Sequence, residues 1–83
     1  GKFEYYHANG KLKHVGVYKE NKETGEHKWY SESGSLEAIE HYRNGELDGV
    51  FTEYYPNGKL SIETSFKQGR QNGKTTYYRE DGK

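Results

Sequence analysis

The side chains best suited to chemistry in this chain are its four histidines, because the sequence contains no cysteine. They are His7, His14, His27 and His41. A zinc site needs several ligands at characteristic spacings, and none of these histidines stands at such a spacing with a second ligand. We expect structural histidines, partly buried at the end of a sheet, and predict neither a metal site nor a cofactor. A transition-metal site built from histidines alone stays open as the alternative.

Other residues that could react lack the context that catalysis requires. The carboxylates are interleaved with lysines and arginines, which is typical of solvated cross-strand ion pairs that each contribute little. The serines stand outside any strand–turn–helix setting that would expose a nucleophile. The glycines fall at expected turns, where positive φ is needed, so they do not predict a phosphate-binding loop. We therefore predict that the chain is not an enzyme.

Composition narrows the classes of partner. The 83 residues include 13 basic and 13 acidic side chains, and the net charge is zero. Sheets that bind nucleic acid normally carry a clear basic excess, so we predict no nucleic-acid partner despite the interleaved aromatic and basic residues. Attraction to an anionic membrane surface also scales with clustered lysine and arginine, so the membrane is possible as a partner but not favoured.

A period of 24 residues organises the chain. Two glycines, one tyrosine and one leucine recur at fixed positions of this period: Gly1, Gly25, Gly49, Gly73; Gly10, Gly34, Gly58, Gly82; Tyr6, Tyr30, Tyr54, Tyr78; and Leu12, Leu36, Leu60. Such a period is typical of repeat arrays, in which each unit packs mainly on its neighbours. We expect one domain over residues 1–83 with units 1–24, 25–48, 49–72 and a partial unit 73–83, forming a fragment or processed part of a longer protein.

Each unit has the pattern of a β-hairpin. Asn57-Gly58 and Asn9-Gly10 favour two-residue type I′ turns, and Ser33-Gly34 and Asp81-Gly82 are weaker versions of the same signal. Short turns require antiparallel neighbours. The sequence therefore predicts an all-β fold, an elongated single antiparallel meander sheet of stacked β-hairpin repeats with about seven strands. We expect the strands near 2–7, 11–19, 26–31, 35–43, 50–55, 59–67 and 74–79, with links at Glu20–Thr24, Asn44–Asp48 and Gln68–Asn72.

A two-residue turn at Asn57-Gly58 also predicts the register and the faces of the sheet. The predicted pairs are Tyr55 with Leu60, Glu53 with Ile62 and Phe51 with Thr64. The same face collects the predicted core: Phe3, Tyr5, Leu12, Tyr18, Trp29, Leu36, Tyr42, Phe66 and Tyr77. The opposite face carries a regular column of tyrosines: Tyr6, Tyr30, Tyr54 and Tyr78. A longer turn would shift the register by one residue and exchange the two faces.

The repeat resembles the MORN repeat, in particular the bacterial variant of YwqK-type antitoxin-like proteins. The shared pattern is aromatic-x-x-Gly-x-x-x-Gly followed by Tyr-x-x-x-Gly-x-Leu, represented here by Tyr42, Gly45, Gly49, Tyr54, Gly58 and Leu60. Asn21 in place of a glycine and Glu53 in place of an aromatic or apolar residue depart from it. The resemblance implies a solenoid-like array of hairpins. It also implies protein scaffolding, oligomerisation or binding of acidic phospholipids, and the antitoxin-like role given to the bacterial variant.

We therefore expect a non-catalytic protein-binding or scaffolding module, antitoxin-like by resemblance, with a peripheral binder of anionic phospholipid headgroups as the alternative. The candidate binding surface is the aromatic face of Tyr6, Tyr30, Tyr54 and Tyr78, because tyrosine offers a large contact area at low entropic cost. A column that serves stability alone is an equally weighted interpretation. The open sheet edges at 2–7 and 74–79 also favour self-association.

Overall fold

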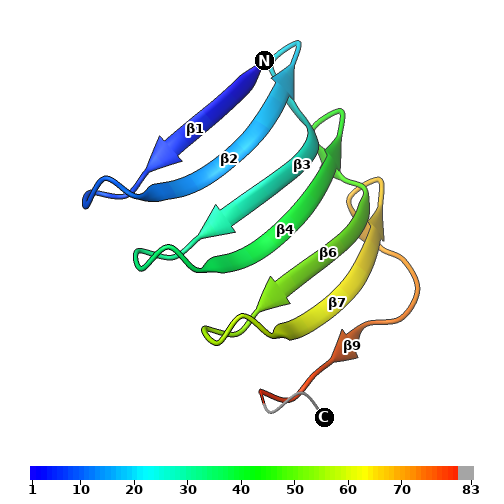
Figure 1. The fold of residues 1–83 in the computed structure, drawn as a ribbon. Helices are drawn as coiled ribbons and strands as arrows, with labels where there is room; N and C mark the ends of the chain where they lie inside the picture. The colour runs from blue at the N-terminus through cyan, green and yellow to red at the C-terminus, as the bar shows by residue number, and fades with distance from the viewer. Residues whose placement is uncertain (81–83) are drawn as a thin grey trace.

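One open antiparallel sheet makes up the computed structural model, which describes residues 1–80 (Figure 1). Its nine strands are β1 (Lys2–Tyr6), β2 (Leu12–Lys19), β3 (Lys22–Tyr30), β4 (Leu36–Arg43), β5 (Glu46–Leu47), β6 (Gly49–Tyr54), β7 (Leu60–Lys67), β8 (Arg70–Gln71) and β9 (Thr76–Tyr77). Their spatial order is β1-β2-β3-β4-β6-β7-β8, with β5 paired to β4 and β9 paired to β7. The predicted all-β meander of hairpins is confirmed.

The two strands beyond the expected seven are β5 and β8, which fall inside the predicted links 44–48 and 68–72. Each is a two-residue strand that follows a turn and pairs with the end of the strand before that turn, β5 with β4 and β8 with β7. The described residues contain no helix, and thus none long and apolar enough to cross a membrane.

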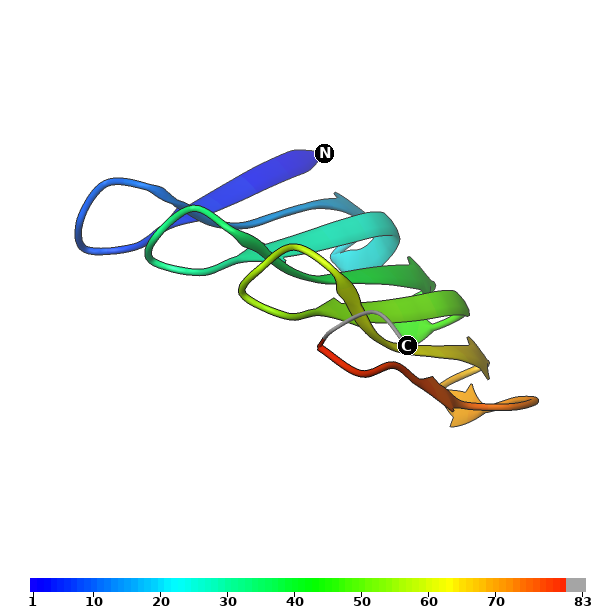
Figure 2. The same ribbon diagram turned by 60° about the horizontal axis from the view of Figure 1, so that its bottom comes forward.

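The sheet is a single layer. It measures 41 × 37 × 12 Å, and the edge-on view shows hairpins in register with nothing packed above or below them (Figure 2). Among residues 1–80 no hydrophobic side chain is fully buried, and the buried residues are Gly16, His27 and Thr64. Because neither face has a covering layer, the aromatic side chains that form the predicted core remain partly exposed.

The turns differ from the prediction at both ends of the hairpins. The type I′ turns lie at the links: Glu20 and Asn21 have φ of 53° and 67°, and Asn44 and Gly45 have 53° and 84°. Gln68-Gly69 repeats this geometry. The prediction was therefore wrong in placing these turns at Asn9-Gly10 and Asn57-Gly58. The turn predicted at Asp81-Gly82 lies outside the described residues.

At the other end, each hairpin closes with a three-residue loop. Gly58 N–H donates to Tyr55 O at 2.8 Å, and Gly58 has φ of 88° while Asn57 has no positive φ. Asn57 Oδ1 instead accepts the N–H of Lys59 at 2.9 Å, and this local bond stabilises the loop without a left-handed asparagine. A loop of this kind ends in a glycine bulge, which the asparagine–glycine pair alone does not distinguish from a two-residue turn.

The three-residue loop shifts the register by one residue, and a second bulge between Leu60 and Ile62 restores the predicted pairing farther along the strands. Glu53 lies opposite Ile62 and Phe51 opposite Thr64, as predicted, but Leu60 lies opposite Tyr54 rather than Tyr55. Ser61 is the extra residue. The same shift pairs Tyr6 with Leu12 and Tyr30 with Leu36.

Hydrogen bonds between neighbouring units recur along the array. Asn9 Nδ2 donates to Glu32 O at 2.8 Å, and Asn57 Nδ2 donates to Glu80 O at 3.1 Å. At the opposite end, Gly45 N–H donates to Glu23 O at 2.9 Å. These bonds tie neighbouring units together at both ends of the hairpins, which is the nearest-neighbour coupling expected of a repeat array.

The first type I′ turn is the least suited to its conformation. Glutamate is unfavourable at positive φ, and the equivalent positions of the next turn hold Asn44 and Gly45. The double substitution Glu20→Asn/Asn21→Gly should stabilise the chain by about 1 kcal/mol. A urea titration of both proteins measures the difference. An unchanged or lower midpoint would contradict the assignment of this turn.

Candidate functional site

The two faces of the sheet carry different chemistry. We call the side with His14, His27 and Trp29 the histidine face, and the side with the tyrosine column the tyrosine face. The cross-strand partners Tyr5–His14, His14–Trp29 and Trp29–Ala38 continue through Glu53, Ile62 and Tyr77 as one row across the histidine face.

The structure places the predicted tyrosine column opposite this row. Tyr6 OH donates to Glu4 Oε1 at 2.9 Å, and Tyr78 OH donates to Glu63 Oε1 at 3.3 Å. The hydrogen bond to Glu4 raises the pKa of Tyr6, while burial and then Glu63 raise that of Tyr78. Tyr6 is 57% exposed, whereas Tyr30, Tyr54 and Tyr78 are partly exposed. The column is thus accessible at the surface.

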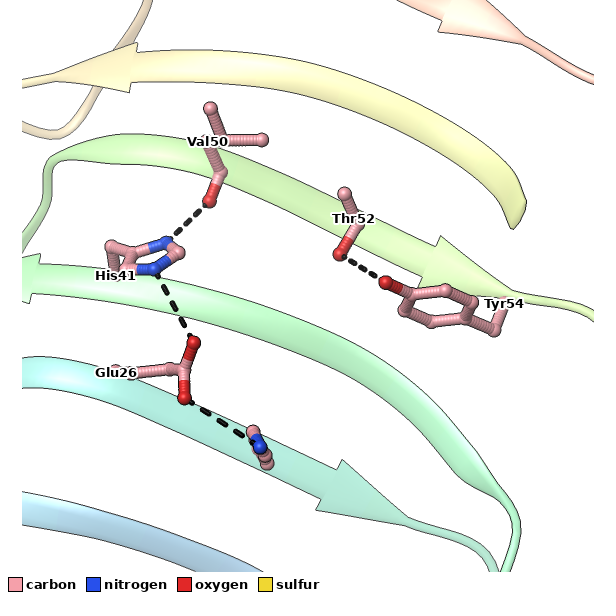
Figure 3. A network of polar contacts seen from close by, with 6 residues as sticks. Glu26, His41, Val50, Thr52 and Tyr54 are labelled. Atoms are coloured by element: carbon pink, nitrogen blue, oxygen red, sulfur yellow. Dashed lines mark hydrogen bonds and ion pairs between the residues drawn. The ribbon is translucent and has the colours of Figure 1, made fainter. Parts of the chain in front are cut away.

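Polar contacts on the same face run along β3, β4 and β6, and Tyr54 is the member of the column that takes part in them (Figure 3). Glu26 is 3.6 Å from Lys28 Nζ and 3.7 Å from His41 Nε2. His41 Nδ1 donates to Val50 O at 2.7 Å, which ties β4 to β6. Thr52 Oγ1 donates to the phenol oxygen of Tyr54 at 3.3 Å. Charges of both signs therefore lie on the same face as the column.

The most enclosed group of the chain lies on the histidine face. His27 has no exposed surface, and its ring occupies the space where a side chain at Gly16 would stand. Rings of Phe3, His14 and Tyr42 surround it at centroid distances of 5.5, 5.2 and 4.7 Å. The prediction of a partly buried histidine at a sheet end was wrong for His27, because Gly16 on β2, the strand next to the edge, leaves room for the ring.

Hydrogen bonds fix the orientation of this ring. His27 Nε2 lies 3.1 Å from Val17 O and 3.2 Å from Thr24 O. The Val17 N–H also lies 3.4 Å from Nε2, but the two shorter carbonyl contacts favour a proton on Nε2, and in that tautomer Nδ1 accepts from His14 Nε2–H at 3.1 Å. The two histidines are a structural pair, and both nitrogens of His27 are occupied.

Aromatic stacking and one carboxylate extend this cluster toward the sheet centre. The His14 ring stacks on Trp29 at 3.6 Å with an interplanar angle of 13°. Trp29 Nε1 donates to Glu40 Oε1 at 2.7 Å, and Tyr42 OH donates to the same oxygen at 3.2 Å. Burial and the Glu40 charge raise the pKa of Tyr42 to about 12. These bonds fix the indole in one orientation.

A shallow hollow of about 500 Å³ opens beside Trp29. Its lining is Trp29, Glu37, Ala38, Glu40, Phe51, Glu53, Tyr54 and Ser61. Of these, Trp29, Ala38, Glu40, Phe51 and Glu53 belong to the histidine face, whereas Tyr54 is a member of the tyrosine column. Within residues 1–80 no group of three potential metal ligands is placed to hold a metal ion.

The cluster and the hollow were missed from the sequence because each depends on small residues in strands. Glycine and alanine are weak strand formers by propensity. In the sheet, Gly16 makes room for the ring of His27, and Ala38 makes room for the hollow. A glycine in the middle of a strand is a known indication of such close approach, and Gly16 was the available signal.

The contact between Gly16 and His27 can be tested by filling the space. A Cβ at position 16 would lie 2.4 Å from His27 Nδ1, and Gly16 has no positive φ, so the effect of Gly16→Ala is steric. We expect a loss of about 2–3 kcal/mol in the free energy of unfolding. Lys13→Ala on the same strand is the control. In a His27→Ala background the same change should cost far less, and equal costs in both backgrounds would refute the contact.

The histidine pair should make stability depend on pH. Burial and then His27 lower the pKa of His14, with Lys13 acting in the same direction and Glu40 and Glu23 opposing it. Because the unfolded state takes up this proton more readily, stability is present above the unfolded value of about 6.5 and falls as the pH drops below it.

The urea midpoint should therefore decrease between pH 7.5 and pH 5.5. His14→Gln is the matched variant, since its amide can still donate to His27 Nδ1 but does not titrate in this range. It should show a smaller decrease, and an equal decrease in both proteins would exclude His14 as the cause.

The family comparison agrees with this architecture. The model described as the MORN repeat variant matches residues 1–20, 23–44 and 47–68, and the gaps between the matched segments fall at the first two type I′ turns. No curated protein and no solved structure matches the chain. Because the matched segments cover most of the sequence, the chain belongs to the MORN repeat variant family.

Proposed function

We propose that this chain is a non-catalytic protein-binding module and that the tyrosine face is its contact surface. MORN repeats generally bind proteins or membranes and are generally non-catalytic. The observation that carries the proposal is the single layer: neither face is covered, and no hydrophobic residue among residues 1–80 is fully buried. A partner on one face would complete the burial that the chain does not achieve by itself.

The tyrosine face has the composition of a protein interface. Tyr6, Val17 and Val50 are 57%, 37% and 45% exposed, and they stand among polar groups with charges of both signs. Tyrosine supplies a large contact area with few rotatable bonds, and apolar centres surrounded by polar groups are typical of interfaces.

The same charges favour a protein over a membrane. An anionic lipid surface selects clustered lysine and arginine, but the chain has no net positive charge, and Lys28 on this face is paired with Glu26. Scaffolding is the broader form of the proposed binding, and an antitoxin-like role, in which the module covers a toxin, is a narrower form of it.

The face is tested by two matched double variants. Tyr6→Ser/Tyr30→Ser removes tyrosines from the tyrosine face, and Tyr5→Ser/Tyr77→Ser removes tyrosines from the histidine face, where they are 55% and 74% exposed. We expect a partner captured from cell lysate by the parent chain to be lost by at least about tenfold with the first variant, because two anchor residues are removed, and to be retained by the second.

Circular dichroism and a urea titration must first show that both variants fold. Equal retention by the two variants would exclude the tyrosine face. Salt-sensitive flotation with anionic vesicles, without a captured protein, would favour the phospholipid alternative instead.

A further inference from the structure

We propose that the hollow on the histidine face binds an arginine side chain of a protein partner. The proposal rests on the protein-binding function above and adds a second contact, which is centred on the histidine face and has Tyr54 of the tyrosine column in its lining. It rests on the shape, the ring placement and the charge of the hollow between β3, β4 and β6.

The shape follows from one small residue in a row of large ones. Position 38 of the second unit is alanine, whereas the equivalent positions of the first and third units are His14 and Ile62. Its cross-strand partners are Trp29 on β3 and Glu53 on β6. Their strands are two spacings apart, about 9.5 Å, and only a methyl group stands between them. This width accommodates one planar group against the indole.

The indole of Trp29 is fixed in an orientation that leaves one side open to such a group. His14 covers one face of Trp29, and Glu40 fixes the indole N–H, so the ring side toward β4 lines the hollow. Phe51, two residues before Glu53 on β6, adds a second ring to the lining. The centroid of this ring lies 6.1 Å from that of Phe66 in an edge-to-face arrangement. Immobilised rings bind a ligand without paying the entropy of ordering side chains.

The charge of the hollow selects the ligand. Glu37, Glu40 and Glu53 line it, and no lysine or arginine does. Among residues 1–80, Glu37 and Glu53 form no ion pair, although the whole chain is neutral. The hollow is therefore locally negative in a chain with no net charge, and it is complementary to a cation.

Aromatic walls distinguish an organic cation from a metal ion. A cation over a tryptophan face is attracted by the ring, and within this hollow it also lies near carboxylates. Arginine fits better than lysine because its planar guanidinium stacks on aromatic rings and binds carboxylates with two parallel bonds. The occupant we assign is therefore an arginine of the partner, with Trp29 as the stacking surface and Glu53 as the ion-pairing group.

The test uses the chain's single tryptophan as its reporter. The fluorescence of Trp29 is followed while acetyl-Gly-Arg-Gly-amide is added, and the neutral, nearly isosteric citrulline peptide serves as the ligand control. We expect a saturable change with the arginine peptide and none with the citrulline peptide. No saturable change, or the same change with both peptides, would overturn the proposal.

Three variants locate the binding. Glu53→Gln should weaken it about tenfold, because one charge-assisted pair is lost, and Ala38→Leu should abolish it by filling the hollow. Glu20→Gln is the matched charge control, since glutamine already occupies the equivalent turn position at Gln68. Equal effects of Glu53→Gln and Glu20→Gln would show binding to the general negative charge and refute the site.

The outcome is independent of the test of the tyrosine face. Tyr6→Ser/Tyr30→Ser should leave the arginine titration unchanged, because neither residue lines the hollow. If the chain binds the peptide but captures no partner, the proposed protein-binding function is refuted and the arginine site is supported. If the chain captures its partner through the tyrosine face but its fluorescence does not respond to the peptide, only the arginine site is refuted.

Discussion

Pairing of each hairpin with its neighbour is the constraint on which the rest of this molecule depends. A sheet 12 Å thick has no second layer, so burial must come from side chains that lie side by side on one face. The backbone ladders and the turn-to-turn bonds of Asn9 and Asn57 bring those side chains into rows. Stability is then a property of adjacent units, and each unit depends on the contacts that its neighbours supply.

Departures from the repeat are where the faces acquire their individual chemistry. Gly16, Glu40 and Thr64 occupy the same position of successive units, and only the glycine admits a neighbouring ring. The result is a histidine buried in a layer in which no hydrophobic residue within 1–80 is fully buried. Burial of a polar ring is tolerated there because His14 and two backbone carbonyls satisfy both of its nitrogens.

Much of this fold could be predicted because glycines, tyrosines and leucines recur at fixed positions of the 24-residue period. The sheet, the approximate strand ranges and the pairing of Glu53 with Ile62 follow from strand alternation. The position of the type I′ turns could not be predicted, since Asn-Gly also suits a three-residue loop with a glycine bulge. The hollow was beyond reach for a different reason: it depends on the absence of a side chain at Ala38 between residues far apart in the sequence, which no local pattern records.

The row through the hollow also shows a conflict between stability and binding. Tyr5, Trp29, Glu53 and Tyr77 share one repeat position, and the glutamate is the one member that contributes no aromatic surface. In a sheet that depends on partly exposed aromatic rings, replacing a ring by an unpaired carboxylate weakens packing with the neighbouring strands. Such a residue has a physical rationale if its charge is used by a ligand, since functional sites are where a sequence departs from its own stabilising pattern. Glu53 stands beside the smallest residue of the same row, so the cost in packing and the space for a cation coincide.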